Sequence, residues 1–159
     1  MVEVVVEAVE QVPVAEPSAD AEVEHEAHAL RRALGLAARR VRAERGSADL
    51  PDPQFNVLAL LAAHGVTTPG RLAELERVRP PSMTRTVACL VDRGLVAKEE
   101  DPHDGRQVLV ALTEAGRAEV AETRRRRDVW LSRRLAEMTP EDRTCLARAA
   151  VLLGRMAQS

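Results

Sequence analysis

The fold of this chain is decided by residues 80–113, which read PPSMTRTVACLVDRGLVAKEEDPHDGRQVLVALT. Over residues 81–93 the apolar side chains recur at the spacing of one helix face, namely Met83, Val87, Leu90 and Val91. The opposite face then carries Pro81, Ser82, Arg85, Cys89 and Asp92. Gly94 suits the left-handed position that ends a helix, with Leu95 making the accompanying apolar contact. The pattern predicts a helix with a polar outer face, starting at two prolines that tolerate a helix start.

Two short extended runs follow, at residues 95–100 and 107–112. In the second run Val108, Val110 and Leu112 alternate with other residues, as on one face of a strand. The segment between the runs is polar and rich in loop formers. We therefore expect a β-hairpin with a basic tip, in which Asp104 pairs with Arg106 and fixes its direction.

Start and stop signals place the other helices. Asp52-Pro53 and Thr68-Pro69 each combine an N-cap residue with a proline at the first helical position. They predict one helix that ends near Gly65 and a shorter one that follows it. Before them, a helix closed by Gly46 and Ser47 has an apolar seam at helix-packing spacing, formed by Val23, Ala27, Leu30, Leu34, Ala37 and Val41. After the hairpin, Thr113 caps a long helix that reaches about Glu137, and Pro140 opens the last one.

A short helix, a turn and a helix with a polar outer face form a helix-turn-helix, and a hairpin directly after it forms a wing. The second helix of such a motif enters the major groove of DNA, while a wing reaches the backbone or the minor groove. Here the N-terminal outer face offers Ser82 and Arg85, flanked by Thr84 and Thr86. Arg85 can donate two hydrogen bonds to a guanine edge, which contributes ~1–3 kcal/mol of discrimination. The backbone N–H groups around Pro81 and Ser82 are expected to favour a phosphate.

At these residues the chain resembles the MarR family of transcriptional regulators. The family's wing motif is similar to Asp104-Gly105-Arg106 followed, after five residues, by Leu112-Thr113. The family's recognition helix is similar to residues 81–85 followed by Leu90 and by residues 94–96. The resemblance spans roughly residues 24–157. It implies a homodimer that binds palindromic double-stranded DNA, with Ser82 and Arg85 in the major groove, Arg106 in the minor groove and Pro81 setting the approach. It further implies release from DNA by a small-molecule effector.

Charge and pattern together divide the chain. Residues 1–29 hold eight acidic side chains and no Lys or Arg, so the formal charge of −2 is the sum of −8 there and +6 over the rest. We expect residues 1–22 to form a mobile acidic extension, although a later translation start is the alternative. Residues 23–157 are expected to form one domain of the MarR type. Within it, residues 53–113 would be the winged helix-turn-helix, and residues 23–46 and 114–157 the dimerisation helices.

Several other classes of function have little support. Aromatic residues are 1% of the chain, which excludes recognition by rows of stacked bases. There is no Gly-rich phosphate loop, His-Glu-x-x-His motif or nucleophile elbow, so an enzyme is not expected. His25 and His28 share a helix face without a third ligand nearby, so neither a metal nor a cofactor is expected. The longest apolar run, residues 57–63, is too short to span a membrane, and with no secretory signal pattern we expect a cytoplasmic protein.

Some alternatives stay open at this point. Oxidation of Cys89 would disturb a DNA contact, whereas Cys145 has the pattern of a small apolar residue. The four arginines at residues 124–127 form either a solvated helix face or a source of long-range attraction to DNA. Trp130 either packs within the dimerisation helices, called the arm below, or lines a ligand cavity between the arm and the winged helix-turn-helix. The alternative to a regulator is a helical protein-interaction module without tight DNA binding.

Overall fold

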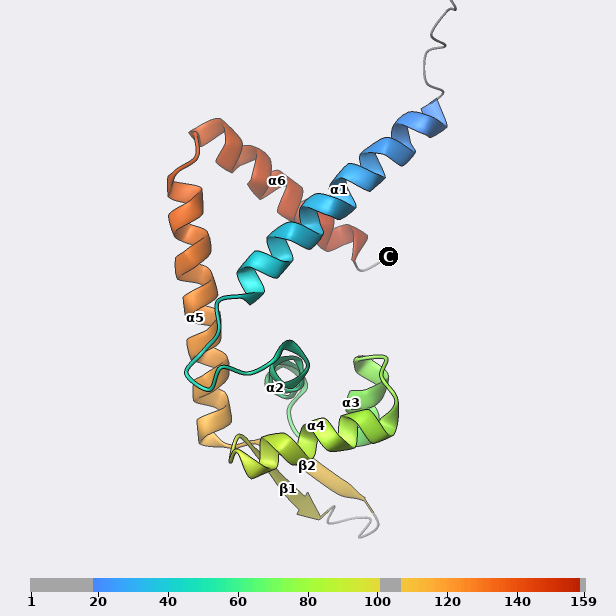
Figure 1. Ribbon diagram of the computed structural model, residues 1–159, viewed down its shortest axis with the longest axis vertical. Coiled ribbons are helices and arrows are strands. Elements are labelled where there is room, and N and C mark those ends of the chain that lie inside the picture. The colour runs from blue at the N-terminus through green and yellow to red at the C-terminus, as the bar shows by residue number, and fades with distance from the viewer. Residues whose placement is uncertain (1–18, 101–106, 158–159) are drawn as a thin grey trace, which may run out of the picture. The chain divides into compact units, whose positions relative to one another are not determined.

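The computed structural model describes residues 19–100 and 107–157. Its elements, in chain order, are α1 (Ala19–Arg42), α2 (Asp52–His64), α3 (Pro69–Leu75), α4 (Pro80–Asp92), β1 (Val96–Glu100), β2 (Val108–Leu112), α5 (Glu114–Ala136) and α6 (Pro140–Met156). This order confirms the predicted fold class, mainly α with a small β-hairpin wing (Figure 1). The chain divides into two compact units, the first ending at Ala38 and the second beginning at Arg39.

In its described part, the first unit is the larger portion of α1. The helix begins at Ala19, four residues before the expected start at Val23. No residue of α1 is buried, and Val23, Leu30 and Leu34 of the predicted seam are exposed. These apolar side chains therefore remain available for packing against another helix.

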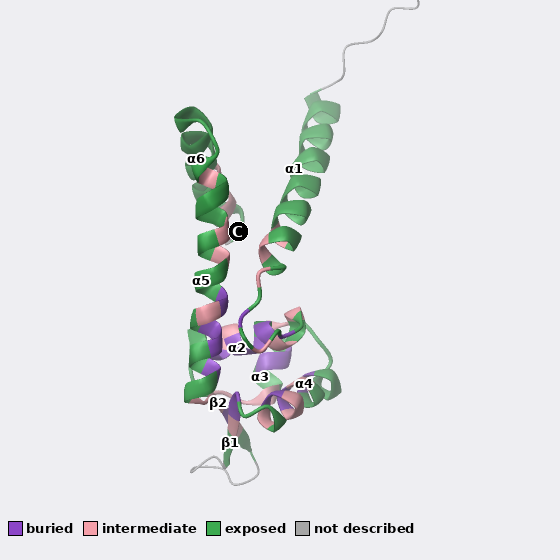
Figure 2. Cartoon of the chain, turned by 60° about the vertical axis from the view of Figure 1, so that its left-hand side comes forward, coloured by how far each residue is buried: buried purple, intermediate pink, exposed green. Residues whose placement is uncertain are grey.

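The second unit contains the hydrophobic core. Its fully buried apolar side chains come from α2, α3, α4 and both strands, and include Leu58, Leu72, Leu90, Val87, Val96 and Val110. Figure 2 shows the buried residues gathered where these elements meet the N-terminal half of α5. The core is aliphatic apart from Phe55, as the scarcity of aromatic residues predicts. This packing buries one face of α4 in the core and leaves the opposite face exposed to solvent.

Besides the earlier start of α1, two further helix boundaries differ from the prediction. Helix α2 begins at Asp52 itself, its N-cap residue is Pro51, and no side chain caps it. Helix α1 ends at Arg42, so Gly46 lies in the loop beyond it. Gly46 is needed there for another reason: a methyl group on its Cα would overlap the carboxyl group of Glu119 in α5.

The hairpin pairs β1 with β2 in antiparallel register, from Val96 opposite Leu112 to Glu100 opposite Val108. The predicted alternation on β2 buries Val110 fully and Leu112 partly, but Val108 is 43% exposed. Val108 lies at the end of the strand farthest from the helices, where no core reaches it. Thr67, just before α3, extends the sheet by two backbone hydrogen bonds to Val110, of 3.1 and 2.8 Å.

Both C-terminal helices begin where they were predicted to begin. The hydroxyl of Thr113 accepts a hydrogen bond from the Gly116 N–H at the start of α5, and that of Thr139 accepts one from the Asp142 N–H at the start of α6. No residue of α6 is buried within this chain. In the part of the chain that the structure describes, no helix is both long and apolar enough to cross a membrane.

Candidate nucleic-acid interface

Helix α3, a turn and α4 form the predicted helix-turn-helix. The hydroxyl of Thr68 accepts a hydrogen bond from the Arg71 N–H (3.1 Å), which confirms the predicted start of α3. The helix ends after Leu75 in a turn that passes through Arg77, whose φ is +53°. The chain then enters α4 at Pro80, one residue before the predicted start.

Helix α4 has the two faces that its sequence predicts. Met83, Val87 and Leu90 are at most 2% exposed and pack into the core. On the other face Pro81, Ser82 and Arg85 are exposed, whereas Cys89 and Val91 are half-buried at the boundary between the faces. Cys89 is therefore less open to solvent than the outer face on which it was predicted.

The structure brings the five predicted α4 residues together within its first two turns. Among the described residues, Arg85 has no hydrogen-bond or ion-pair partner, so its guanidinium group is available to a ligand. The hydroxyl of Thr84 donates to the Pro80 carbonyl (3.0 Å) and that of Thr86 donates to the Ser82 carbonyl (3.1 Å). Both threonines have thus committed their hydroxyl protons to the helix and can offer only an acceptor oxygen to DNA.

The expectation that backbone N–H groups at the start of α4 bind a phosphate was wrong. Pro80 and Pro81 have no N–H, and the next two groups, of Ser82 and Met83, both donate to the Arg79 carbonyl at 3.0 and 3.2 Å. The first turn of the helix therefore presents no free backbone donor, although its dipole still favours negative charge. A phosphate near this helix would have to be bound by side chains.

The far end of α4 fixes where the wing begins. Gly94 has a φ of +69°, its N–H donates to the Val91 carbonyl (2.8 Å), and the Leu95 N–H donates to the Leu90 carbonyl (2.9 Å). This is the helix ending that Gly94 and Leu95 predicted. The hydroxyl of Thr113 also donates to the Gly94 carbonyl (2.7 Å), so one residue joins the end of α4 to the start of α5. The two wing residues predicted to bind DNA, Asp104 and Arg106, lie outside the described residues.

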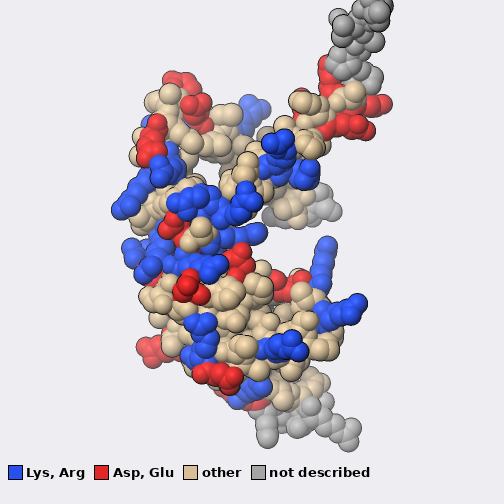
Figure 3. Space-filling view, viewed as in Figure 1, with Lys and Arg blue, Asp and Glu red and all other residues tan. Residues whose placement is uncertain are grey.

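Two cations near the turn were not among the predicted DNA-binding residues. Arg77 and Arg79 are exposed, and neither has a hydrogen-bond or ion-pair partner through its side chain among the residues the structure describes. Figure 3 shows basic side chains projecting from the surface over α3 and α4. The spacing Arg-x-Arg directly before the two prolines was the signal that could have identified them.

The four arginines at 124–127 do not form one solvated face. Arg125 and Arg126 both donate hydrogen bonds to Glu122, at 2.8 and 2.6 Å, and these bonds lower the pKa of Glu122 to about 2. The guanidinium carbon of Arg127 instead lies over the ring of Phe55, 4.3 Å from the ring centroid, and the guanidinium group donates a hydrogen bond to the Glu44 carbonyl (3.2 Å). Burial there lowers the pKa of Arg127 from its ordinary value. Arg127 therefore packs α5 against α2, a role that could not be predicted from the run of four arginines.

Trp130 is partly buried in the arm under two arginines. The guanidinium carbons of Arg40 and Arg134 lie 4.9 and 5.8 Å from the centre of its ring. This arrangement favours the packing interpretation of Trp130 over the ligand-cavity interpretation.

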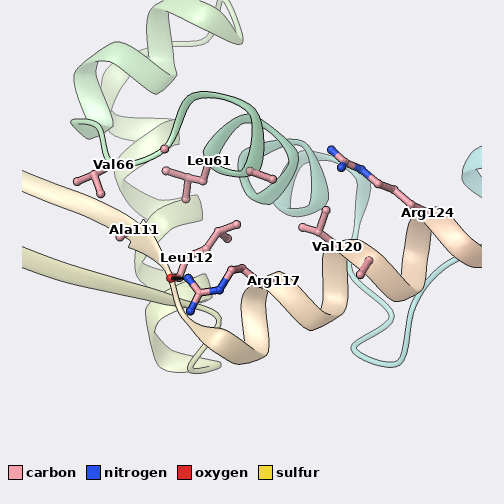
Figure 4. Close-up of a pocket in the computed structure, with 10 residues that line it drawn as sticks. Leu61, Val66, Ala111, Leu112, Arg117, Val120 and Arg124 are labelled. Carbon is pink, nitrogen blue, oxygen red and sulfur yellow. Dashed lines mark hydrogen bonds between the residues drawn. The ribbon is translucent and has the colours of Figure 1, made fainter.

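A separate pocket of about 400 Å³ opens between α2, β2 and α5. Its lining is mostly apolar and includes Leu61, Val66, Leu112 and Val120, together with Arg117 and Arg124. Figure 4 shows the two arginines extending from α5 on either side of Val120. Arg117 donates a hydrogen bond to the Leu112 carbonyl (2.8 Å), while Arg124 has no such partner among the described residues. The pocket can therefore hold a small, mainly apolar molecule that carries a negative charge.

Comparison with known proteins agrees with this arrangement. The model of the MarR family matches residues 48–107. The chain is 45% identical over 115 residues to the HTH-type transcriptional regulator MT0903.1 of Mycobacterium tuberculosis, an alignment that covers 72% of this chain and 80% of that protein.

Solved structures share the same fold over nearly their whole length. Rv1404 of Mycobacterium tuberculosis is 29% identical with a TM-score of 0.67, and the match covers 89% of this chain and 95% of Rv1404. BpsR of Bordetella bronchiseptica, whose DNA binding is regulated by 6-hydroxynicotinic acid, is 26% identical with a TM-score of 0.61, covering 84% and 98%. The open helix-turn-helix, the wing and these similarities show together that the chain belongs to the MarR family of helix-turn-helix transcriptional regulators and is not an enzyme.

Proposed function

We propose that this regulator is a repressor that binds a palindromic DNA operator as a homodimer and is released by a small-molecule effector. The observation that carries the proposal is the exposed N-terminal face of α4, where Ser82 and Arg85 stand free of the protein core. A helix presented in this way fits the major groove, and the guanidinium fork of Arg85 matches the two acceptors of a guanine edge.

The other DNA contacts of the proposal come from the remaining predicted residues of α4 and from the wing. Pro81 sets how closely the start of α4 approaches the groove, and the hydroxyl oxygens of Thr84 and Thr86 accept hydrogen bonds from bases or bound water. In the wing, Arg106 enters the minor groove and Asp104 orients it. These residues form the DNA-binding set of the proposal.

The homodimer is supported by the apolar side chains that the arms leave uncovered. On α6, Leu146, Val151 and Leu152 are 44 to 56% exposed, and on α1 Leu30 and Leu34 are 41 and 42% exposed. Exposed apolar faces of this extent are typical of helices that pack against a partner subunit. A two-fold dimer presents two copies of α4, which read half-sites about one helical turn apart.

The effector site of the proposal is the pocket between α2, β2 and α5. A small aromatic carboxylate suits its apolar lining and its two arginines, and this matches the ligand named for the related BpsR. The pocket lies between the arm helix α5 and elements that support α4, so a ligand that fits one spacing of these elements better would shift the population toward it. Repression would then be relieved by a change in the distance between the two recognition helices.

Selection of the bound DNA tests the proposal. Purified protein should enrich, from a random duplex library, sequences with an inverted repeat whose half-sites lie about one turn apart. Addition of 6-hydroxynicotinic acid, as the probe carboxylate, should weaken binding of the enriched duplex by wild-type protein and weaken it less for Arg124→Ala. Enrichment of no sequence, or of single half-sites bound by a monomer, would contradict the proposal.

A further inference from the structure

The turn between α3 and α4 is closed by a residue in an unusual conformation. Arg77 has a φ of +53°, in the left-handed region that L side chains seldom adopt. Its N–H donates to the Glu74 carbonyl (3.1 Å), and the Val78 N–H donates to the Ala73 carbonyl (3.0 Å). These two bonds are the pattern in which a helix end normally places glycine, because glycine has no Cβ to clash there.

The fold uses only the backbone of residue 77. Both hydrogen bonds of the turn come from main-chain atoms, and glycine at position 77 would make them equally well. The arginine side chain is exposed and has no hydrogen bond or ion pair in the described ranges 19–100 and 107–157. By contrast, Arg71 on the preceding helix pairs with Glu74 at 2.8 Å. A strained conformation therefore holds a side chain for which the fold has no evident use.

The position of Arg77 indicates what the side chain is for. It lies three residues before the start of α4, whose first turns carry Ser82 and Arg85. When those residues reach base edges, the chain that leads into the helix passes beside the edge of the major groove, which is formed by phosphates. Because Pro80, Pro81 and the bonded Ser82 N–H leave the helix start without a free backbone donor, a phosphate there must be bound by a side chain.

We infer that Arg77 binds a phosphate of the DNA backbone and that this contact is the reason the turn holds an arginine where glycine would be less strained. The inference rests on the proposed function, since it requires α4 to lie in the major groove. Strain that persists at a functional position is a recognised feature of binding sites.

The test is the variant Arg77→Gly, with thermal unfolding and DNA affinity measured on the same full-length protein. Relief of the left-handed strain should raise Tm by roughly 2–4 °C. Loss of one phosphate contact per subunit should weaken binding of the duplex enriched by wild-type protein by at least about fivefold, and should lower the slope of log K against log salt by about 0.9 per subunit. A random-sequence duplex should lose affinity by a similar factor, since phosphate contacts carry no sequence information.

Two further variants serve as controls. Arg77→Lys keeps the charge and should retain most of the salt slope. Asp49, in the loop between α1 and α2, is the other non-glycine residue with a positive φ (+45°) among the described residues. Asp49→Gly should leave the DNA affinity and the slope of log K against log salt unchanged.

Opposite outcomes separate this inference from the proposed function. If the wild type selects its DNA but Arg77→Gly keeps the wild-type affinity and slope, or if its Tm falls, the inference is wrong and the regulator proposal stands. If the wild type itself shows neither sequence preference nor salt dependence, both fail.

Discussion

The backbone N–H of Ala48 donates a hydrogen bond to Oε2 of Glu119, at 3.0 Å. Glu119 lies in α5 and is only 6% exposed, and its other oxygen accepts a hydrogen bond from the hydroxyl of Thr123 (3.3 Å). The Ala48 carbonyl in turn accepts a hydrogen bond from Arg93 at the end of α4. The loop that carries Ala48 is thus bonded on one side to the arm helix and on the other to the recognition helix.

Removing the acceptor at position 119 should destabilise the protein. In Glu119→Leu the Ala48 N–H and the Thr123 hydroxyl lose their partner, which should reduce the free energy of unfolding by about 1–3 kcal/mol. Glu119→Gln keeps one acceptor oxygen and should lose clearly less. Urea unfolding of the three proteins measures the difference, and equal losses in both variants would show that the hydrogen bonds to Glu119 contribute nothing specific.

The arginines around Glu122 should give a stability difference that depends on pH. Hydrogen bonds from Arg125 and Arg126 lower the pKa of Glu122 from its ordinary value of 4.5 to about 2 in the folded protein. A group whose pKa is lowered by folding adds stability above its unfolded pKa and loses that contribution as the pH falls through its folded pKa. The Tm advantage of wild type over Glu122→Gln should therefore be constant near neutral pH and shrink as the pH falls from 4.5 toward 2.

Because Glu122 is partly exposed, this advantage should be small and should weaken in high salt. Glu137→Gln, which breaks the exposed pair with Arg134, is the matched control and should change Tm very little. A Glu122→Gln protein whose Tm deficit grows on acidification would refute the assignment.

Deletion of residues 1–22 should leave both folding and DNA binding intact. The deletion removes six acidic side chains and no Lys or Arg. Of the deleted residues the structure describes 19–22, and all four are exposed. Apart from the first turn of α1, which the deletion removes, the helix content measured by circular dichroism should be kept. The affinity for the enriched duplex should match that of the full chain or rise slightly as negative charge is lost. Loss of helix content or of affinity would show that the extension takes part in the fold or in the complex.

The elements of this protein were predictable where the signals are local. Helical spacing in α4, the caps at Thr68 and Thr113 and the left-handed Gly94 each depend on residues within one or two turns, and each was confirmed. The alternation of β2 was correct at Val110 but overstated at Val108, because alternation does not show where the core ends.

What escaped prediction depends on contacts between distant segments. Glu119 has the local pattern of a solvated helix residue, and only the approach of the loop at Ala48 makes it a buried acceptor. Arg127 could not be separated from its three neighbouring arginines until Phe55 was placed beneath it. Likewise, no propensity rule assigns a left-handed conformation to Arg77, because the turn between two packed helices imposes it.

The most direct test of the account is the affinity of Arg85→Ala for the duplex that wild-type protein enriches. Loss of a bidentate contact to guanine should weaken binding by roughly 5- to 150-fold, the range that corresponds to 1–3 kcal/mol, with a much smaller loss on a random-sequence duplex. Arg45→Ala, which removes an equal charge from a loop residue paired with Asp49, should bind like the wild type. Equal, salt-insensitive binding by wild type and Arg85→Ala would contradict the claim that α4 reads DNA sequence.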